Sequence, residues 1–223
     1  MDAQAVTITI PGSDAVSGLW LAPLNPLACL VLAHGAGAGM AHRSMVAIAE
    51  GLAARNVASL RYQFPYMERG GKRVDPPALA HAAVRAAVAK ARGLAGSSPL
   101  FAGGKSFGGR MTSQAQSLEP LGGVRGLVFF AFPLHPAGKP STERAGHLAD
   151  VKVPMLFLQG TKDLLAQLDL LRQTVAGLGA RASLRLFEEA DHSFHAPAKT
   201  GRNDAEILAQ LLDAAADWMA AQR

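Results

Sequence analysis

The sequence contains one cysteine, Cys29, so no disulfide can form within the chain. Disulfides are typical of proteins from oxidising compartments, and a chain without one suits a reducing interior, so we expect a cytoplasmic protein. The first residues include Asp2 and lack a basic segment followed by an apolar stretch. No apolar run reaches the roughly 20 residues that a membrane helix needs. We therefore expect neither a signal peptide nor a membrane-spanning segment.

Charged residues are also scarce, at 17% of the 223 residues, against 49% hydrophobic residues. The net charge is +5, but the lysines and arginines are scattered, whereas a nucleic-acid interface needs a clustered basic face. Cysteine and histidine do not occur with metal-ligand spacing, and no H-E-x-x-H motif is present. These absences predict no metal, no cofactor, no nucleic acid and no membrane partner. We expect instead a small-molecule substrate, and a protein that is a monomer or a small homo-oligomer.

The hydrophobic pattern is that of an α/β protein, and the length fits one domain over residues 1–223. The first two predicted strands flank the turn Pro11–Asp14 and should form an antiparallel hairpin. Asp75 and Pro76 are expected to cap and begin a helix that runs to about residue 93. Another helix should begin after Asn203, because apolar residues recur there at helical spacing. Predicted strands cover 6–10, 17–21, 27–33, 57–62, 99–102, 126–132, 153–159 and 182–188, and a further helix covers 44–55.

The most informative stretch is Gly103–Gly109, which contains G-x-S-x-G between an apolar strand and a helix-compatible run. In that context the motif is typical of a nucleophile elbow, in which a sharp turn exposes the serine above the sheet. Ser106 would be the nucleophile. The backbone N–H of Phe107, at the first turn of the helix, would point at a developing oxyanion. A glycine-rich chain can also contain this motif by chance, so the other catalytic groups must be found.

An acid and a base follow in the order that such a site requires. Asp163 comes just after a predicted strand and a glycine turn, where it could orient a histidine; it could equally be a helix N-cap. His192 lies in a loop after the last predicted strand and is the candidate base. Asp169 and His195 are the alternatives. The spacing predicts a Ser106, Asp163 and His192 triad.

A second glycine-rich loop, His34–Met40, follows the strand predicted at 27–33. It could supply the second oxyanion donor, with the N–H of Ala36 as the first candidate and Gly37 as the next. His34 is expected to hold the loop by hydrogen bonds. The loop lacks both G-x-G-x-x-G and the ending of a P-loop, which disfavours phosphate binding. A flexible turn without function is the alternative.

Several apolar side chains follow predicted strands at the edge of the sheet where open α/β proteins bind ligands. Met40, Phe64, Tyr66 and Leu134 could line an acyl pocket there. The alternative is that the aromatic residues only pack their loop onto the core. No long helical insertion follows the strand predicted at 126–132, so any lid must be small.

With these motifs in place, the chain resembles the α/β-hydrolase superfamily over essentially its whole length. More narrowly, it is similar to small, lid-poor bacterial hydrolases near the dienelactone-hydrolase branch, through the runs at His34–Gly37 and Tyr62–Met67. The resemblance implies a mostly parallel eight-stranded sheet with helices on both faces and no large cap domain. Dienelactone hydrolase itself uses a cysteine nucleophile, whereas this chain has Ser106, which argues against lactone specificity.

The resemblance and the motifs together predict a serine hydrolase that cleaves small esters or thioesters through an acyl-enzyme. A peptidase or an acyltransferase could use the same triad. A binding or scaffold module that keeps only the hydrolase shell is the alternative from a different class, although such relatives usually lose a triad member.

Overall fold

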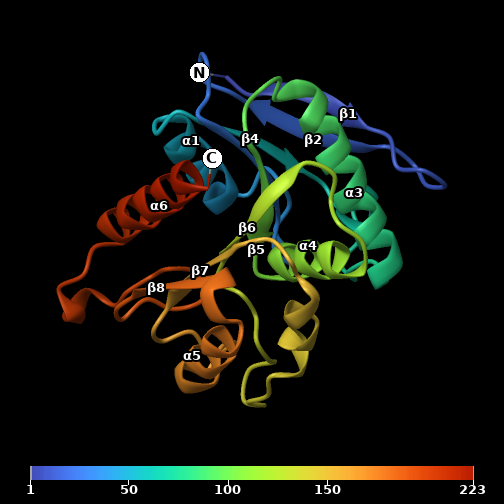
Figure 1. Ribbon diagram of the computed structural model, residues 1–223. Coiled ribbons are helices and arrows are strands. Elements are labelled where there is room, and N and C mark those ends of the chain that lie inside the picture. The colour runs from blue at the N-terminus through green and yellow to red at the C-terminus, as the bar shows by residue number, and fades with distance from the viewer. Residues whose placement is uncertain (1, 223) are drawn as a thin grey trace.

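The computed structural model describes residues 2–222, and a single eight-stranded sheet forms its centre (Figure 1). The strand order is β1-β2-β4-β3-β5-β6-β7-β8. The β1–β2 and β2–β4 pairs are antiparallel, and all other neighbours are parallel. The strands are β1 (Gln4–Ile8), β2 (Val16–Leu21), β3 (Ala28–Ala33), β4 (Val57–Tyr62), β5 (Leu100–Lys105), β6 (Val124–Phe130), β7 (Met155–Gly160) and β8 (Ala182–Phe187). The mixed, mostly parallel sheet confirms the predicted fold class.

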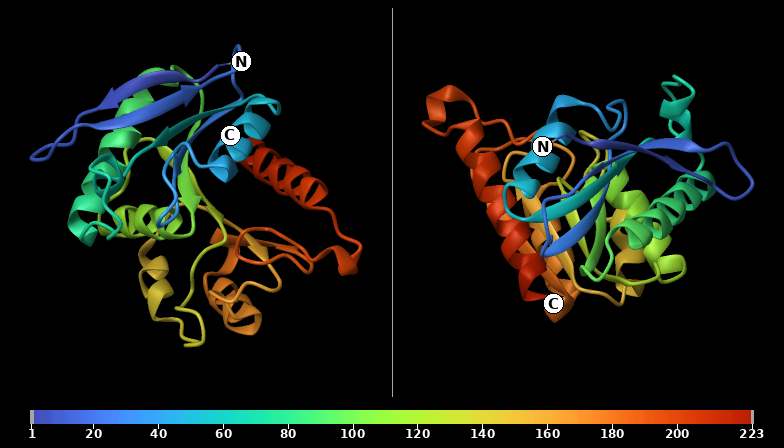
Figure 2. Two further views of the ribbon diagram at one scale, coloured as in Figure 1. Left: turned by 180° about the vertical axis from the view of Figure 1, so that it is seen from behind. Right: turned by 90° about the horizontal axis from the view of Figure 1, so that it is seen from above.

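Helices cover both faces of the sheet, as predicted (Figure 2). The first and last helices pack together on one face, around Ile48, Leu52 and Leu212. The longer helix between β4 and β5 and the helix after β5 cover the other face. The helices are α1 (Arg43–Ala53), α2 (Pro65–Glu68), α3 (Pro77–Leu94), α4 (Phe107–Leu118), α5 (Leu168–Gly177) and α6 (Asp204–Ala221), with 3-10 helices η1 (Glu143–Asp150), η2 (Gly179–Arg181) and η3 (Ala198–Thr200).

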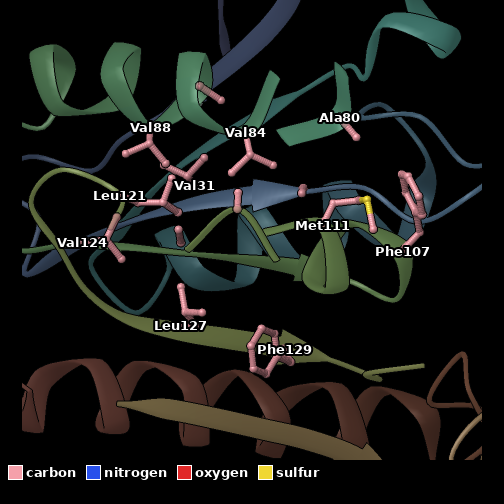
Figure 3. Packing of buried hydrophobic residues seen from close by; sticks show 14 of the residues in the cluster. Val31, Ala80, Val84, Val88, Phe107, Met111, Leu121, Val124, Leu127 and Phe129 are labelled. Atoms are coloured by element: carbon pink, nitrogen blue, oxygen red, sulfur yellow. The ribbon is translucent and has the colours of Figure 1, made fainter. Parts of the chain in front are cut away.

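The central strands are buried on both faces, which explains their nearly continuous apolar sequences. Between α3 and the sheet, Val84 and Val88 face Val31, while Met111 and Phe107 extend from α4 into the same layer (Figure 3). This packing anchors the first turn of α4, the turn that follows the predicted nucleophile.

The cap predicted for α3 is wrong. Pro76, not Asp75, is the N-cap residue, and its side chain makes no capping hydrogen bond. The Asp75 carboxylate turns away from the helix and accepts hydrogen bonds from the Tyr66 N–H (3.0 Å) and from Arg69 (3.1 Å). Burial of Asp75 explains the difference, because a buried carboxylate needs both donors. The cap predicted at Asn203 is confirmed, since its side chain accepts from the Ala205 N–H.

No large insertion stands between β6 and β7. The connection is a loop followed by η1, so the fold has no lid, in agreement with the sequence. None of the helices within residues 2–222 is long and apolar enough to cross a membrane.

Candidate active site

Ser106 occupies a sharp turn between β5 and α4, with φ 50° and ψ −115°. A positive φ is unusual for a residue with a side chain and is held here by its surroundings. The Ser106 N–H donates to the Phe130 carbonyl of the neighbouring strand, and its own carbonyl accepts from Arg110 one helical turn later. The turn therefore presents a serine side chain at the carboxyl edge of the sheet.

The glycines around Ser106 are required because backbone from β3 passes close by. A Cβ on Gly104 would lie 2.3 Å from the Ala33 carbonyl oxygen, and one on Gly108 would lie 2.6 Å from the same atom. Real Cβ atoms do not approach so closely, so a larger residue would have to displace the strand. Both glycines of G-x-S-x-G are explained by this packing.

Three polar side chains from distant parts of the chain meet at this turn. The Ser106 Oγ lies 2.8 Å from His192 Nε2, and His192 Nδ1 lies 2.7 Å from the Asp163 carboxylate. Asp163 follows β7 and His192 follows β8, so adjacent parallel strands place them at one edge. The structure thus brings the predicted triad residues into a continuous hydrogen-bonded chain.

The Asp163 side chain is fully buried, whereas a quarter of the His192 side chain is exposed. Three donors face the carboxylate: His192, the Leu165 N–H at 2.8 Å, and the amide of Gln159 from the end of β7. These contacts fix the carboxylate in one orientation. Fixed in that way, it favours the His192 tautomer whose Nδ1 carries the proton and whose Nε2 is free to accept one from Ser106.

The two alternatives considered for acid and base lie elsewhere. His195 is exposed and its Nδ1 contacts Asp204 at 2.7 Å, which raises the pKa of His195. Asp169 lies in the first turn of α5. Neither residue belongs to the hydrogen-bonded chain that ends at Ser106.

The glycine-rich loop lies against the elbow, because a Cβ on Gly35 would come within 3.8 Å of Ser106 Cβ. His34 is buried and bonded on both ring nitrogens, to the Gly35 carbonyl (2.8 Å) and the Phe64 N–H (3.0 Å). Burial lowers the pKa of His34, so its imidazole is neutral and serves as both donor and acceptor. The expected hydrogen bond from His34 to the loop is therefore present at Gly35, and the second bond joins His34 to Phe64, which precedes α2.

Further contacts fix the rest of the loop. The Tyr66 hydroxyl accepts from the Gly37 N–H at 3.3 Å, and Gln63 accepts from the Met40 N–H at 2.9 Å. Within residues 2–222, the N–H groups of Ala36 and Phe107 have no hydrogen-bond partner. An oxyanion hole requires such unpaired donors, and the role of these two N–H groups in one stays a prediction.

The apolar side chains predicted to line a pocket differ in exposure. Phe64 and Leu134 are completely buried, and the Phe64 ring packs edge-on against Phe107 at 5.2 Å between centroids. Tyr66 is also buried, and Met40 is partly exposed. Substrate contact by these four residues stays a prediction.

Sequence reasoning missed one neighbour of the triad. Lys105, directly before Ser106, is largely buried, and its Nζ donates to the His192 carbonyl at 2.9 Å while lying 5.5 Å from the centre of the Phe194 ring. Lys105 occupies the variable position of G-x-S-x-G, so no motif drew attention to it. Within residues 2–222, no cluster of three or more histidine, cysteine or acidic side chains could hold a metal ion.

The sheet order, the elbow after β5 and the hydrogen-bonded Ser106, His192 and Asp163 together define an α/β-hydrolase. Comparison with protein families supports that class: residues 26–220 match the model of the alpha/beta hydrolase domain family, and the chain belongs to that family.

Solved structures show the same fold at low sequence identity. Dienelactone hydrolase from Anabaena variabilis superimposes with a TM-score of 0.77 at 19% identity, covering 97% of this chain and 96% of that one. A serine hydrolase without a lid from Xanthomonas campestris gives 0.74 at 18% identity, covering 98% and 95%. Est1E from Butyrivibrio proteoclasticus gives 0.74 at 15%, covering 98% of each chain.

Proposed function

We propose that the protein is a serine hydrolase that cleaves small ester or thioester substrates through an acyl-enzyme on Ser106. The observation that carries the proposal is the unbroken chain from Ser106 Oγ through His192 to Asp163, with contacts of 2.8 and 2.7 Å. A serine hydroxyl is a weak nucleophile at neutral pH and needs a base within hydrogen-bond reach. His192 stands at that distance.

The proposed reaction has two halves. His192 Nε2 takes the hydroxyl proton as Ser106 Oγ attacks the carbonyl carbon, and Asp163 stabilises the imidazolium that forms. The N–H groups of Phe107 and Ala36 bind the tetrahedral oxyanion. His192 then gives its proton to the departing alcohol or thiol. Water attacks the acyl-enzyme in the same way and releases the acid.

The absence of a lid supports small substrates. A lid shields long apolar chains from water, and here only a loop and η1 stand between β6 and β7. Among the similar folds, Est1E has been solved with ferulic acid bound, at 15% identity. That ligand belongs to Est1E, but it is a carboxylic acid of modest size and therefore resembles the acyl group proposed for this chain.

Fluorophosphonate labelling tests the nucleophile directly. The wild type should be labelled and Ser106→Ala should not. Ser113→Ala is a matched control, because Ser113 Oγ also contacts a histidine, His147 Nε2 at 2.7 Å, but is fully buried and lies outside the hydrogen-bonded chain to Asp163. Ser113→Ala should keep the label. Labelling of Ser106→Ala at full strength would overturn the proposal.

Hydrolysis of p-nitrophenyl esters from acetate to decanoate tests the substrate class. We expect activity that peaks at the short acyl chains and disappears in Ser106→Ala. A peak at decanoate would contradict the small-substrate proposal. A folded wild type that neither hydrolyses any ester nor accepts the label would favour a binding module instead.

A further inference from the structure

A strip of basic side chains runs across α4 and its two neighbouring segments, one turn beyond Ser106. The exposed side of α4 is bordered by α3 and by η1, the amber 3-10 helix near α4 in Figure 1. Arg110 lies on α4, Arg144 and His147 on η1, and His81 and Arg85 on α3. Side-chain contacts hold the three segments together: His81 bonds Gln114 at 3.2 Å, and His147 bonds Ser113.

The charge of Arg110 is not compensated. Within residues 2–222 its guanidinium takes part in no ion pair or hydrogen bond, and its Nε is buried without a partner. Burial and the positive charge of Arg144 both lower the pKa of Arg110. Arg144 likewise has no carboxylate partner in the described chain.

The carboxylates of the neighbouring segments do not neutralise the two arginines. Glu119 pairs with Arg85 at 3.4 Å, and within residues 2–222 neither Glu143 nor Asp150 forms an ion pair with Arg110 or Arg144. Placing a partly buried cation beside another cation is unfavourable unless an anion balances them. Two arginines without acidic partners are therefore suited to an anionic ligand, which their planar guanidinium groups can bind with paired hydrogen bonds.

The position of Arg110 ties this charge to the active site. Its N–H donates to the Ser106 carbonyl at 3.1 Å, so the two residues are one helical turn, about 5.4 Å, apart along the axis. Side chains on a helix lean toward its N-terminus, and the N-terminus of α4 is the elbow. A substrate whose carbonyl reaches Ser106 would thus extend an anionic group toward Arg110.

We propose that Arg110 and Arg144 bind a carboxylate or phosphate group carried by the substrate that Ser106 attacks, an inference that rests on the proposed hydrolase function. The preferred substrates are then anionic esters or thioesters rather than neutral ones. The anion neutralises both arginines and orients the scissile carbonyl toward the elbow.

Kinetics on matched substrates test the preference and locate the anionic group. In the first pair, mono-p-nitrophenyl glutarate carries a carboxylate on its acyl group and p-nitrophenyl hexanoate does not. In the second pair, butyryl-coenzyme A carries phosphates on its leaving group and butyryl-N-acetylcysteamine does not. We expect the wild type to prefer the anionic member of at least one pair by kcat/KM. That ratio should fall about tenfold in Arg110→Gln, a loss typical of one charged hydrogen-bonded contact.

Arg172→Gln is the control for net charge. Arg172 is exposed on α5, far from α4 in sequence and outside the basic strip, so this variant should keep the wild-type ratio. Equal ratios in wild type and Arg110→Gln for both pairs would overturn the proposal. An equal fall in Arg172→Gln would also overturn it, because the effect would then reflect net charge alone.

A binding experiment separates this proposal from the hydrolase function. On the Ser106→Ala background, millimolar phosphate or glutarate should raise the melting temperature relative to chloride at the same ionic strength. Adding Arg110→Gln should remove the increase. An increase without ester hydrolysis by the wild type would support the anion site and contradict the hydrolase. Hydrolysis without any increase, and without an anionic preference, would contradict the anion site alone.

Discussion

Lys105 and His192 are joined by a hydrogen bond of 2.9 Å from the lysine Nζ to the histidine backbone carbonyl. The bond links the residue before the proposed nucleophile to the residue proposed as its base, across 87 positions of sequence. The Phe194 ring beneath the ammonium adds a cation–π contact at 5.5 Å. The loop that carries His192 is thereby fastened to the elbow, so the Ser106–His192 distance depends on Lys105.

Replacement of Lys105 should therefore lower turnover more than substrate affinity. We expect Lys105→Met to reduce kcat by about tenfold, since small errors in the position of a catalytic base cost one to two orders of magnitude in rate, with KM changed far less. Steady-state kinetics on p-nitrophenyl acetate measure both constants. Lys105→Arg keeps a donor and a cation and should recover part of kcat. An equal loss in both variants would argue against a positioning role.

The two aspartates considered from the sequence should behave oppositely. Asp163→Asn removes the negative charge that stabilises the imidazolium and changes the tautomer of His192, so kcat should fall by about 10²–10⁴. Asp169→Asn, in the first turn of α5, should leave kcat unchanged. Circular dichroism of both variants checks that they fold. A large loss for Asp169→Asn with none for Asp163→Asn would contradict the proposed triad.

The space around two glycines, one at the elbow and one on α3, predicts opposite effects of alanine substitution. Gly104→Ala would place a Cβ 2.3 Å from the Ala33 carbonyl oxygen, and we expect it to destabilise the protein by about 2–4 kcal/mol. Gly93 lies in α3, and a Cβ added there would have no neighbouring atom within 4 Å, so Gly93→Ala should stabilise by about 0.5–1 kcal/mol. Urea unfolding measures both. Tolerance of alanine at Gly104 would contradict the close approach of β3.

His147 should make the protein sensitive to acid. Burial and the charge of Arg110 lower its pKa from 6.5 to about 4, so the unfolded chain binds a proton on this residue at pH values where the folded protein does not. The contribution of neutral His147 to the free energy of unfolding is thus fully present above pH 6.5 and is lost as the pH falls toward 4. With allowance for partial exposure of the side chain, the loss is about 1–2 kcal/mol.

The comparison with His147→Gln isolates this contribution. Between about pH 7 and pH 4.5, urea unfolding should show a smaller loss of stability in the variant than in the wild type. His195→Gln is a control of opposite sign, because Asp204 raises the pKa of His195 and its contribution is lost as pH rises. Identical pH profiles of stability for the wild type and His147→Gln would show that His147 does not cause the sensitivity to acid.

The sequence predicted the strands well because their apolar runs and turn residues are local signals. Strands β3, β4 and β8 begin and end within one residue of the predicted limits, whereas β1 and β6 lie two residues earlier than predicted and β5 ends three residues later. The helical turn α2 and the 3-10 helix η1 were not predicted, because neither is long enough to show a hydrophobic period. Asp75 misled the prediction of the α3 cap, since its donors come from Tyr66 and Arg69 rather than from the helix it precedes.

Some residues of the candidate site could likewise be predicted from the sequence, and others could not. Ser106, Asp163 and His192 could be proposed from chain order, because parallel strands deliver the residues that follow them to one edge of the sheet. Lys105, Gln159 and Arg110 could not, because their importance depends on contacts or on burial that only the folded chain creates. Residues that do chemistry have recognisable types and spacings, whereas those that hold or surround them do not.

Reaction of the Cys29 thiol can be used to detect unfolding of the protein. Its thiol lies in the middle of the sheet, on β3, with no exposed surface, and burial raises its pKa to about 12. Only the thiolate reacts with alkylating reagents, so the folded protein should be inert to them. Modification of this thiol then requires that the central strands separate. The rate of modification therefore measures how often the protein unfolds globally. Cysteines introduced at the surface can consequently carry probes without interference from the native one.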